Sequence, residues 1–326
     1  MNELFENIEE VKDFISIRGD YDFDEIRPYI RKACRKYIKP FCGEIYKELV
    51  DEQSGENAEI KNDIRSLLME SVINFAFYLN IPIGSVHYTS DGISVSDSEN
   101  YKAANNAQVN DLRRDFLRSG HEALDELIIL LNDNPELFEE YNTKYLEKNK
   151  SVLVQSADEF NEVYYIGRSR QTYLALLPII KRVEDQYINT FLCADFLTRI
   201  KTTDVTDNNL KVKENLRKAV VAFTVSKTVY EGQFILDGNG IHLKFDVLPH
   251  EKTVTNINLK INDFLVHTKK EQEVAGLEYL KNAQRIIEDN PNDFPDCAGA
   301  VIINQSEVNE TGSSFKPYDT KGVLGI

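Results

Sequence analysis

Three alternating aspartates are the strongest hint of chemistry in this sequence. Asp20, Asp22 and Asp24 have the spacing that opens a calcium-binding loop. However, Glu25 occupies the position where such a loop needs a glycine to turn, and Arg31 occupies the position of its bidentate glutamate. We therefore interpret the aspartates as a solvated acidic cap at the start of a helix, where negative charge is favourable.

The histidines, glycines and serines match no catalytic or cofactor-binding pattern. His121-Glu122 lacks the second histidine that a zinc-binding helix carries four residues later. Gly238-x-Gly240 lacks the third glycine and the following helix of a phosphate-binding loop. No serine has the G-x-S-x-G frame of a nucleophile elbow. We therefore predict that the protein is not an enzyme and needs no metal or other cofactor.

The cysteines and the net charge indicate the compartment of the protein and whether it coats nucleic acid. Cys34, Cys42, Cys193 and Cys297 form no C-x-x-C motif, which indicates reduced thiols in a cytoplasm. We expect Cys34 and Cys42 to be unbridged thiols in the core or at its edge, because they lie too far apart along one predicted helix to bridge. The net charge of −16 argues against a protein that coats nucleic acid.

No segment of the sequence predicts contact with a membrane. The first residues are acidic and lack the basic region of a signal peptide. The most apolar windows, 71–83 and 218–230, are too short and too interrupted to span a bilayer. With 326 residues, of which 42% are hydrophobic, the chain has room for about two globular domains.

The elements that would position any site occur twice. The stretch 120–138 reappears at 276–294, always 156 positions later, and both copies contain Asn-Pro after a long helical pattern. A repeat of this length indicates a duplicated domain, and the proline predicts where its long helix ends. Gly120 and Gly276 lie inside these helices, where glycine costs about 1 kcal/mol relative to alanine. We therefore expect a close crossing with another helix at both glycines.

Other pairs of elements recur at similar offsets. An amphipathic helix containing Pro28 has a copy containing Pro178, and both helices are predicted to begin just before the proline. A second helix over 59–79 has a counterpart around 216–230, and β-hairpins are predicted at 85–95 and 233–243. The fold class is therefore mainly α with small β-hairpins, in two tandem copies of a helix–helix–hairpin–long helix domain.

Two basic pairs are candidate interaction residues. Arg113-Arg114 and Lys269-Lys270 precede the two glycines at the same distance. They could meet phosphate or an acidic partner, but an isolated basic pair is more often a solvated helix face, and we favour that interpretation.

The order of elements and the local sequence resemble the head–tail connector, or adaptor, proteins of tailed bacteriophages. The resemblance is greatest to uncharacterised connector-like proteins of Bacteroidetes prophages and crAss-like phages. It covers roughly residues 8–294 and is carried by RPYIRKACRKYIKPFCG, IRSLLMESVINFAFYL, DGISVSDSEN, NDLRRDFLRSGHEALDELIILL and SADEFN…SRQTYLALLPIIKRVE. Known adaptors usually contain one such unit, so the doubling departs from the pattern.

The resemblance implies a virion structural protein, made in the cytoplasm of a bacterial host. Its copies would form a ring, commonly twelvefold, between the portal protein and the next tail or ring protein. DNA would pass through the channel without sequence-specific binding. The alternative is a cytoplasmic helical scaffold that binds a host or phage protein as a monomer, and an enzyme of unrecognised type has the least support.

On this interpretation the chain divides into four parts. We predict adaptor-like repeats at 1–138 and 157–294, a charged linker at 139–156 and an extended C-terminal tail at 295–326. The tail is expected to lie on a neighbouring subunit or on the portal, with Phe315, Tyr318 and Ile326 as anchors. The alternative for the tail is a disordered terminus.

Overall fold

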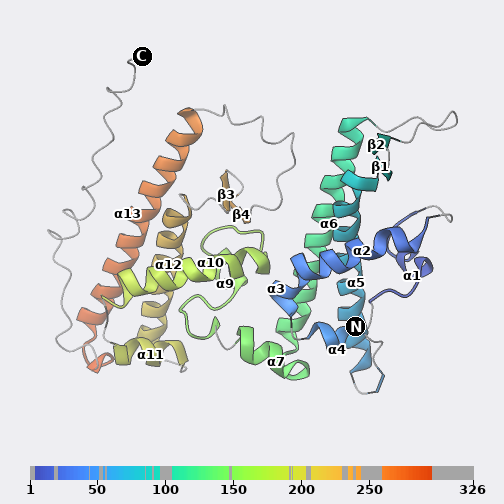
Figure 1. Ribbon diagram of the computed structural model, residues 1–326. Coiled ribbons are helices and arrows are strands. Elements are labelled where there is room, and N and C mark those ends of the chain that lie inside the picture. Colours follow the sequence, from blue (N-terminus) through green and yellow to red (C-terminus); the bar gives the residue numbers. More distant parts are fainter. Residues whose placement is uncertain are drawn as a thin grey trace, which may run out of the picture.

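The computed structural model is mainly helical and contains two short β-hairpins (Figure 1). The same order of helices and strands occurs in both halves, which confirms the predicted tandem fold. The structure describes residues 4–17, 21–43, 45–50, 54–55, 57–84, 86–89, 92–95, 105–146, 149–190, 192, 194–202, 207–229, 234–237, 240–243 and 259–295. The C-terminal tail beyond residue 295, which is predicted to be extended, lies outside the described residues.

The first repeat consists of a crossing helix, a long helix, a hairpin and a second long helix. Its elements are α1 (Ile8–Lys12), α2 (Phe23–Ala33), the π-helical turn η1 (Cys34–Ile38), α3 (Lys39–Cys42), α4 (Tyr46–Leu49), α5 (Ala58–Gly84), β1 (Val86–Thr89), β2 (Gly92–Val95) and α6 (Asn106–Asp133).

The second repeat follows the same plan after a short helical connection. The connection contains η2 (Pro135–Leu137), α7 (Glu139–Tyr141) and η3 (Asn142–Leu146). The second repeat contains α9 (Ala157–Asn161), α10 (Arg170–Val183), the π-helical turn η4 (Glu184–Ile188), α11 (Ala194–Thr202), α12 (Asp207–Thr228), β3 (Phe234–Asp237), β4 (Gly240–Leu243) and α13 (Leu259–Asp289).

Polar side chains fix where several helices begin. Asp22 is the N-cap of α2, where its carboxylate accepts from the Asp24 amide at 2.9 Å, in agreement with the acidic cap predicted here. Asn105 and Gln108 form a reciprocal capping box at the start of α6. The long helices α6 and α13 end immediately before Asn134 and Asn290, each followed by proline, as the sequence indicated.

The predicted starts of the two amphipathic helices are wrong. Helix α2 begins at Phe23, five residues before Pro28, and α10 begins at Arg170, eight residues before Pro178. Each proline therefore lies inside a helix, where it removes one backbone hydrogen bond. Caps outside the apolar pattern, Asp22 and Ser169, determine these starts instead.

Both hairpins form where the sequence predicted them. In the first, Val86 pairs with Val95 and Thr89 with Gly92. In the second, Phe234 pairs with Leu243, and the Ile241 amide also donates to the Tyr165 carbonyl at 3.1 Å. The first residue of β4 is a glycine with a positive φ, and a Cβ there would lie 2.2 Å from that carbonyl oxygen, so the hairpin can approach the chain before α10 only with glycine at this position.

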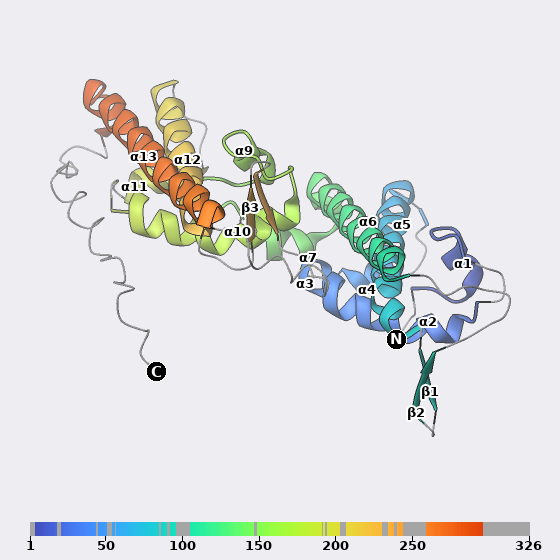
Figure 2. The same cartoon turned by 90° about the horizontal axis from the view of Figure 1, so that it is seen from above.

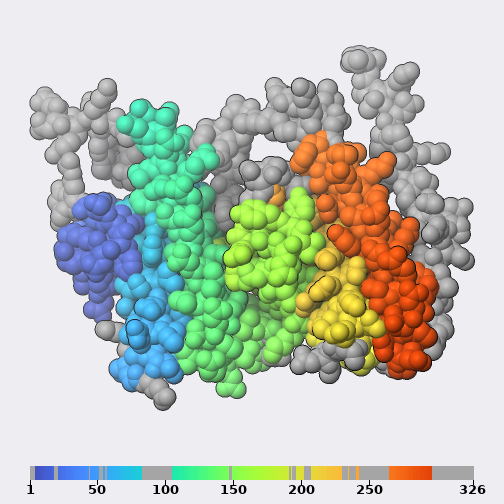
Figure 3. Space-filling view, turned by 180° about the vertical axis from the view of Figure 1, so that it is seen from behind, coloured from blue at the N-terminus to red at the C-terminus, as the bar shows by residue number. Residues whose placement is uncertain are grey.

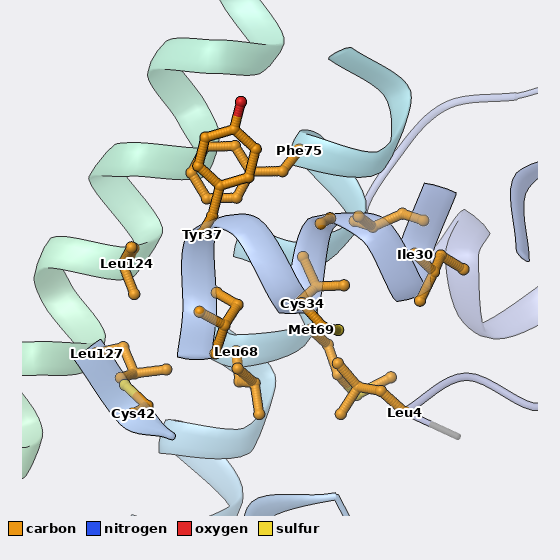
Figure 4. Close-up of a cluster of buried hydrophobic side chains, with 14 of the residues drawn as sticks. Leu4, Ile30, Cys34, Tyr37, Cys42, Leu68, Met69, Phe75, Leu124 and Leu127 are labelled. Atoms are coloured by element: carbon orange, nitrogen blue, oxygen red, sulfur yellow. The ribbon is translucent and has the colours of Figure 1, made fainter. Parts of the chain in front are cut away.

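Each repeat has its own hydrophobic core at the centre of its helices. In the first core, α2 and η1 lie across the α5–α6 pair, and Figure 4 shows Tyr37 stacked on Phe75 above Leu68, Leu124 and Leu127. The second core repeats this arrangement with α10 across α12 and α13. The thiols of Cys34 and Cys42 are buried in the first core, as predicted.

The segment 139–156, predicted to be a charged linker, is part of both cores. Tyr141 is buried in the first core and its hydroxyl donates to the Asn132 side chain at 2.8 Å. Val152, Leu153 and Val154 are buried in the second core. The charged residues that precede this apolar run favoured the linker interpretation, but the connection between the repeats is a packed one.

The repeats lie side by side, with their long helix pairs in sequence across the molecule (Figures 1 and 2). Helix α13 forms one outer edge, and α1 with the start of α2 forms the opposite edge. Figure 3 shows from behind that α6 lies against the beginning of the second repeat. Within the described residues, none of the helices combines the length and the apolar character needed to cross a membrane.

Candidate functional site

The two candidate glycines hold a repeated stack of aromatic rings. A Cβ on Gly120 would lie 2.8 Å from the Phe75 ring, and one on Gly276 would lie 2.7 Å from the Phe223 ring. Phe75 in turn stacks on Tyr37, with ring centroids 3.9 Å apart. The predicted close helix contact is therefore present, and the group that needs the space is an aromatic ring. These glycines are structural.

The π-helical turns η1 and η4 present the tyrosines of these stacks. They occupy equivalent positions in the two repeats, and each shifts the helix by part of a turn. In the second repeat Tyr187 stacks on Phe223 with centroids 4.3 Å apart and planes 9° from parallel. Tyr37 is buried in the first core, and Tyr187 is partly buried against the second core.

The two basic pairs lie partly on exposed helix faces. The guanidinium of Arg113 lies over the Tyr78 ring, 5.4 Å from its centroid, whereas Arg114 is exposed. Lys269, whose side chain is 34% exposed, forms an ion pair with Glu273 at 3.5 Å, and Lys270 is exposed. Arg114 and Lys270 therefore lie on a solvated helix face, and Lys269 does so in part. The remaining candidates, Phe315, Tyr318 and Ile326, lie outside the described residues.

A basic hollow of about 480 Å³ lies beside Lys269 in the second repeat. Arg182, Lys227 and Lys269 line it together with Glu273. In the first repeat the Tyr78 ring lies at the place that Ser226 occupies here, so the smaller side chain leaves this space. The Glu273 carboxylate also contacts the Ser226 hydroxyl at 3.2 Å, and it offsets part of the positive charge.

The most elaborate polar cluster lies at the junction between the repeats, which we define as the contact of Asp125 and His121 on α6 with the start of α10. The Asp125 carboxylate accepts from the backbone amides of Arg170 at 3.1 Å and Gln171 at 3.0 Å. It also accepts from the Ser169 hydroxyl at 3.1 Å. The first turn of α10 contains no acidic residue of its own. Asp125 therefore supplies, from the other repeat, the negative charge that a helix start favours.

Gln171 is a buried residue of the second repeat that joins it to the first repeat at this junction. Its side-chain amide donates to the His121 carbonyl at 2.8 Å, and its side-chain oxygen lies 2.8 Å from the His121 Nδ1. Because that oxygen can only accept, Nδ1 carries the proton. The His121 ring also meets the Phe75 ring edge-on, with centroids 4.8 Å apart. The junction is thus continuous with the first core and fixes how the repeats sit together.

The turn before α10 positions Ser169 for this contact. Gly167 and Arg168 have φ values of 66° and 54°, in the left-handed region. The Asn161 side chain accepts from the Ile166 and Arg168 amides at 3.0 and 3.1 Å. Asparagine thereby stabilises a turn that a non-glycine residue rarely adopts.

The metal-ligating side chains and the thiols of the described residues bear on the chemistry of the site. No group of three or more metal-ligating side chains occurs among them. Burial raises the pKa of the Cys42 thiol to about 12 and also raises the pKa of Cys34, so neither is a thiolate near neutral pH. What the structure presents is a helix start held by the carboxylate of another domain.

Sequence reasoning missed the junction, although one signal pointed to it. Asp125 and Lys281 occupy equivalent positions of the two long helices, so the repeats differ in charge there. Ser169 has the residue type of an N-cap, but the prolines drew the predicted helix start away from it. The carboxylate that completes this cap lies 44 residues earlier in the sequence, so only tertiary packing brings it to the helix start.

Comparisons with known proteins identify the repeats and nothing further. The sequence model of a family of unknown function (DUF6712) matches residues 28–151 and again residues 178–299. The two matches agree with the two structural repeats. Neither the curated proteins nor the solved structures contain a match.

Proposed function

The chain belongs to the DUF6712 family of unknown function, and from its tandem structure we propose that it is a structural protein of a phage virion. It forms a head–tail adaptor ring between the portal protein and the next tail or ring protein. In this role it catalyses no reaction, needs no cofactor and contacts no membrane. The chain is made in the cytoplasm of the bacterial host and ends in the virion.

The junction is the observation that carries this proposal. One surface of the first repeat, on α6, packs against a different surface of the second, at the start of α10. In Figure 1, α2 and α10 run in the same direction. The start of α10 therefore meets α6 of the first repeat, whereas the start of α2 lies at the outer edge of the molecule. Contacts between unlike surfaces can continue from copy to copy and close a ring when the rotation allows it. The resemblance to phage adaptors implies the remaining parts of this proposal: the portal protein as a partner, a DNA channel and twelvefold symmetry.

The charge of the chain suits a channel through which DNA passes. A net charge of −16 repels the phosphate backbone, so DNA can slide without being bound. We propose that the DNA makes no sequence-specific contact. The tail 295–326 contacts the portal or a neighbouring copy.

Virion composition tests this function. We expect the chain in purified particles of the phage that encodes it, and we expect an interrupted gene to yield filled heads without attached tails, with the wild-type gene in trans as the control. A normal yield of infectious particles without the chain would contradict the adaptor role. A chain found only as a cytoplasmic monomer bound to another protein would favour the scaffold alternative.

A truncated chain tests the role of the tail. The second core includes Phe294, whose ring meets Phe196 edge-on with centroids 5.5 Å apart, so a chain ending at residue 295 keeps both cores. We expect this chain to fold, with an unchanged circular dichroism spectrum, but not to enter virions. Normal incorporation would show that the tail is dispensable.

A further inference from the structure

One face of α13 carries a stripe of apolar and positively charged residues, of which Leu277 also packs against the second core. Val266, Lys270, Val274, Leu277 and Lys281 follow one another at spacings of three or four residues, which places them on one helix face. Val266 is 57% exposed and Val274 is 49% exposed, and both lysines are exposed. We refer to these five residues as the α13 stripe. Helix α13, which carries the stripe, lies at the outer edge of the molecule (Figure 1).

The C-terminal end of the α13 stripe is the counterpart of the α6 surface at the junction. Leu277 and Lys281 stand 156 positions after His121 and Asp125, the two α6 residues that hold the start of α10. In the first repeat these two positions are covered by the second repeat, whereas Arg114 and Arg118, the counterparts of Lys270 and Val274, are exposed. In the second repeat the equivalent face lies at the end of the molecule.

Helix α2 is the counterpart of α10, although it begins three residues later relative to its proline, and its start has the opposite charge pattern. Asp22 is its N-cap, Asp24 and Glu25 lie in its first turn, and all three side chains are exposed. Helix α10 has no acidic residue in its first turn and receives a carboxylate from α6. The acidic start of α2 would repel a carboxylate and attract a cation.

We propose that the α13 stripe of one copy packs against the start of α2 in the next copy, in the manner of the junction. Lys281 takes the place of Asp125 and faces Asp22, Asp24 and Glu25 of the next chain. This contact rests on the ring assembly proposed above and specifies how its copies meet.

The reversed charges also determine which repeats can meet. An α6-type surface with Asp125 would place like charges together at the acidic start of α2. An α13-type surface with Lys281 would place a cation at the positive start of α10, which is also unfavourable. Unfavourable wrong pairings of this kind are a common source of specificity. The second repeat of one copy therefore selects the first repeat of the next.

Cross-linking in virions tests the contact. In a chain carrying Cys193→Ser and Cys297→Ser, we combine Lys281→Cys with Asp24→Cys, while Cys34 and Cys42 remain buried. After oxidation, a non-reducing gel of the particles should show a ladder of covalent multimers of this chain. Glu271→Cys with Asp24→Cys is the control, because the exposed Glu271 lies ten residues earlier on α13, and it should give monomer.

Charge reversal gives an independent readout. We expect Lys281→Glu and Asp24→Lys each to reduce incorporation into virions about tenfold, because like charges then face each other. The double variant should restore incorporation, which a merely unfolded chain could not do.

The outcomes separate this contact from the proposed function. If the wild-type chain is in the virion but the 281–24 pair gives no multimers, the contact is wrong and the adaptor role stands. Mass spectrometry would then identify what covers the stripe, whether residues 295–326 of the same chain or another virion protein. If the wild-type chain is absent from virions, the adaptor role and the contact are both wrong.

Discussion

Removing the Asp125 carboxylate should loosen the start of α10 without disturbing α6. Asp125→Ala deletes the acceptor for the Arg170 and Gln171 amides and for the Ser169 hydroxyl. Alanine is a good helix former, so α6 itself remains intact. The change therefore isolates the contribution of the first repeat to the second.

The size of the effect follows from the groups that lose their partner. Loss of a side chain that caps a helix start costs about 1 kcal/mol. Loss of a negative charge from the same position costs up to about 1 kcal/mol more when it is partly exposed. We therefore expect about 2 kcal/mol for Asp125→Ala and about half of that for Asp125→Asn, which keeps one oxygen acceptor.

Hydrogen exchange measures this loss at the affected amides. A cost of about 2 kcal/mol corresponds to roughly thirtyfold faster exchange at Arg170 and Gln171 when local opening limits exchange. Glu122→Gln is the matched control, because it removes a carboxylate from an exposed position of the same helix. Glu122 pairs with Arg118 at 3.9 Å on the surface, and such an exposed ion pair contributes little to stability. Equal protection in Asp125→Ala and Glu122→Gln would refute the idea that Asp125 caps α10.

Three further perturbations concern the second repeat. Gly276→Ala gains about 1 kcal/mol of helix propensity, but its Cβ forces the Phe223 ring aside at a cost of about 1–3 kcal/mol. Urea unfolding should therefore show a net loss of stability near 1 kcal/mol. A gain in stability would contradict the packing argument. Lys201→Met leaves the buried Glu184 carboxylate without its cation at 2.7 Å, so the unfolding free energy should fall by about 3 kcal/mol, and an unchanged melting temperature would count against this. Burial, with nearby carboxylates, raises the pKa of Tyr173, so above pH 10 the unfolded chain loses this phenol proton before the folded chain does. Stability should then fall by about 1.4 kcal/mol per pH unit for this group, and Tyr173→Phe should remove that share of the slope in unfolding measurements from pH 9 to 11.

Sequence periodicity was sufficient for the architecture because each repeat obeys local rules. The apolar spacing of the long helices, the Asn-Pro pairs at their ends and the alternating hairpin strands all predicted elements that the structure contains. The duplication strengthened each of these predictions, since every pattern could be read twice. Of the two positions expected for Cys34 and Cys42, core or core edge, the structure shows the core.

Features that depend on contacts between distant residues could not be read from the sequence. Pro28 and Pro178 suggested helix starts, but the caps that fix those starts lie outside the apolar pattern. The segment 139–156 looked like a charged linker, although three of its apolar residues complete the second core. The role of Asp125 required knowing that α10 begins beside α6, because nothing in the local sequence of α6 distinguishes it from a solvated carboxylate.

Cryo-electron microscopy of the virion neck tests the adaptor role most directly. The measurement is a reconstruction of the region between portal and tail in particles of the phage that encodes this chain. We predict a closed ring in which every copy contributes both repeats and α13 of one copy meets the start of α2 in the next. A reconstruction with no density for the chain at the neck, or with the chain dispersed over the shell, would contradict the proposed function.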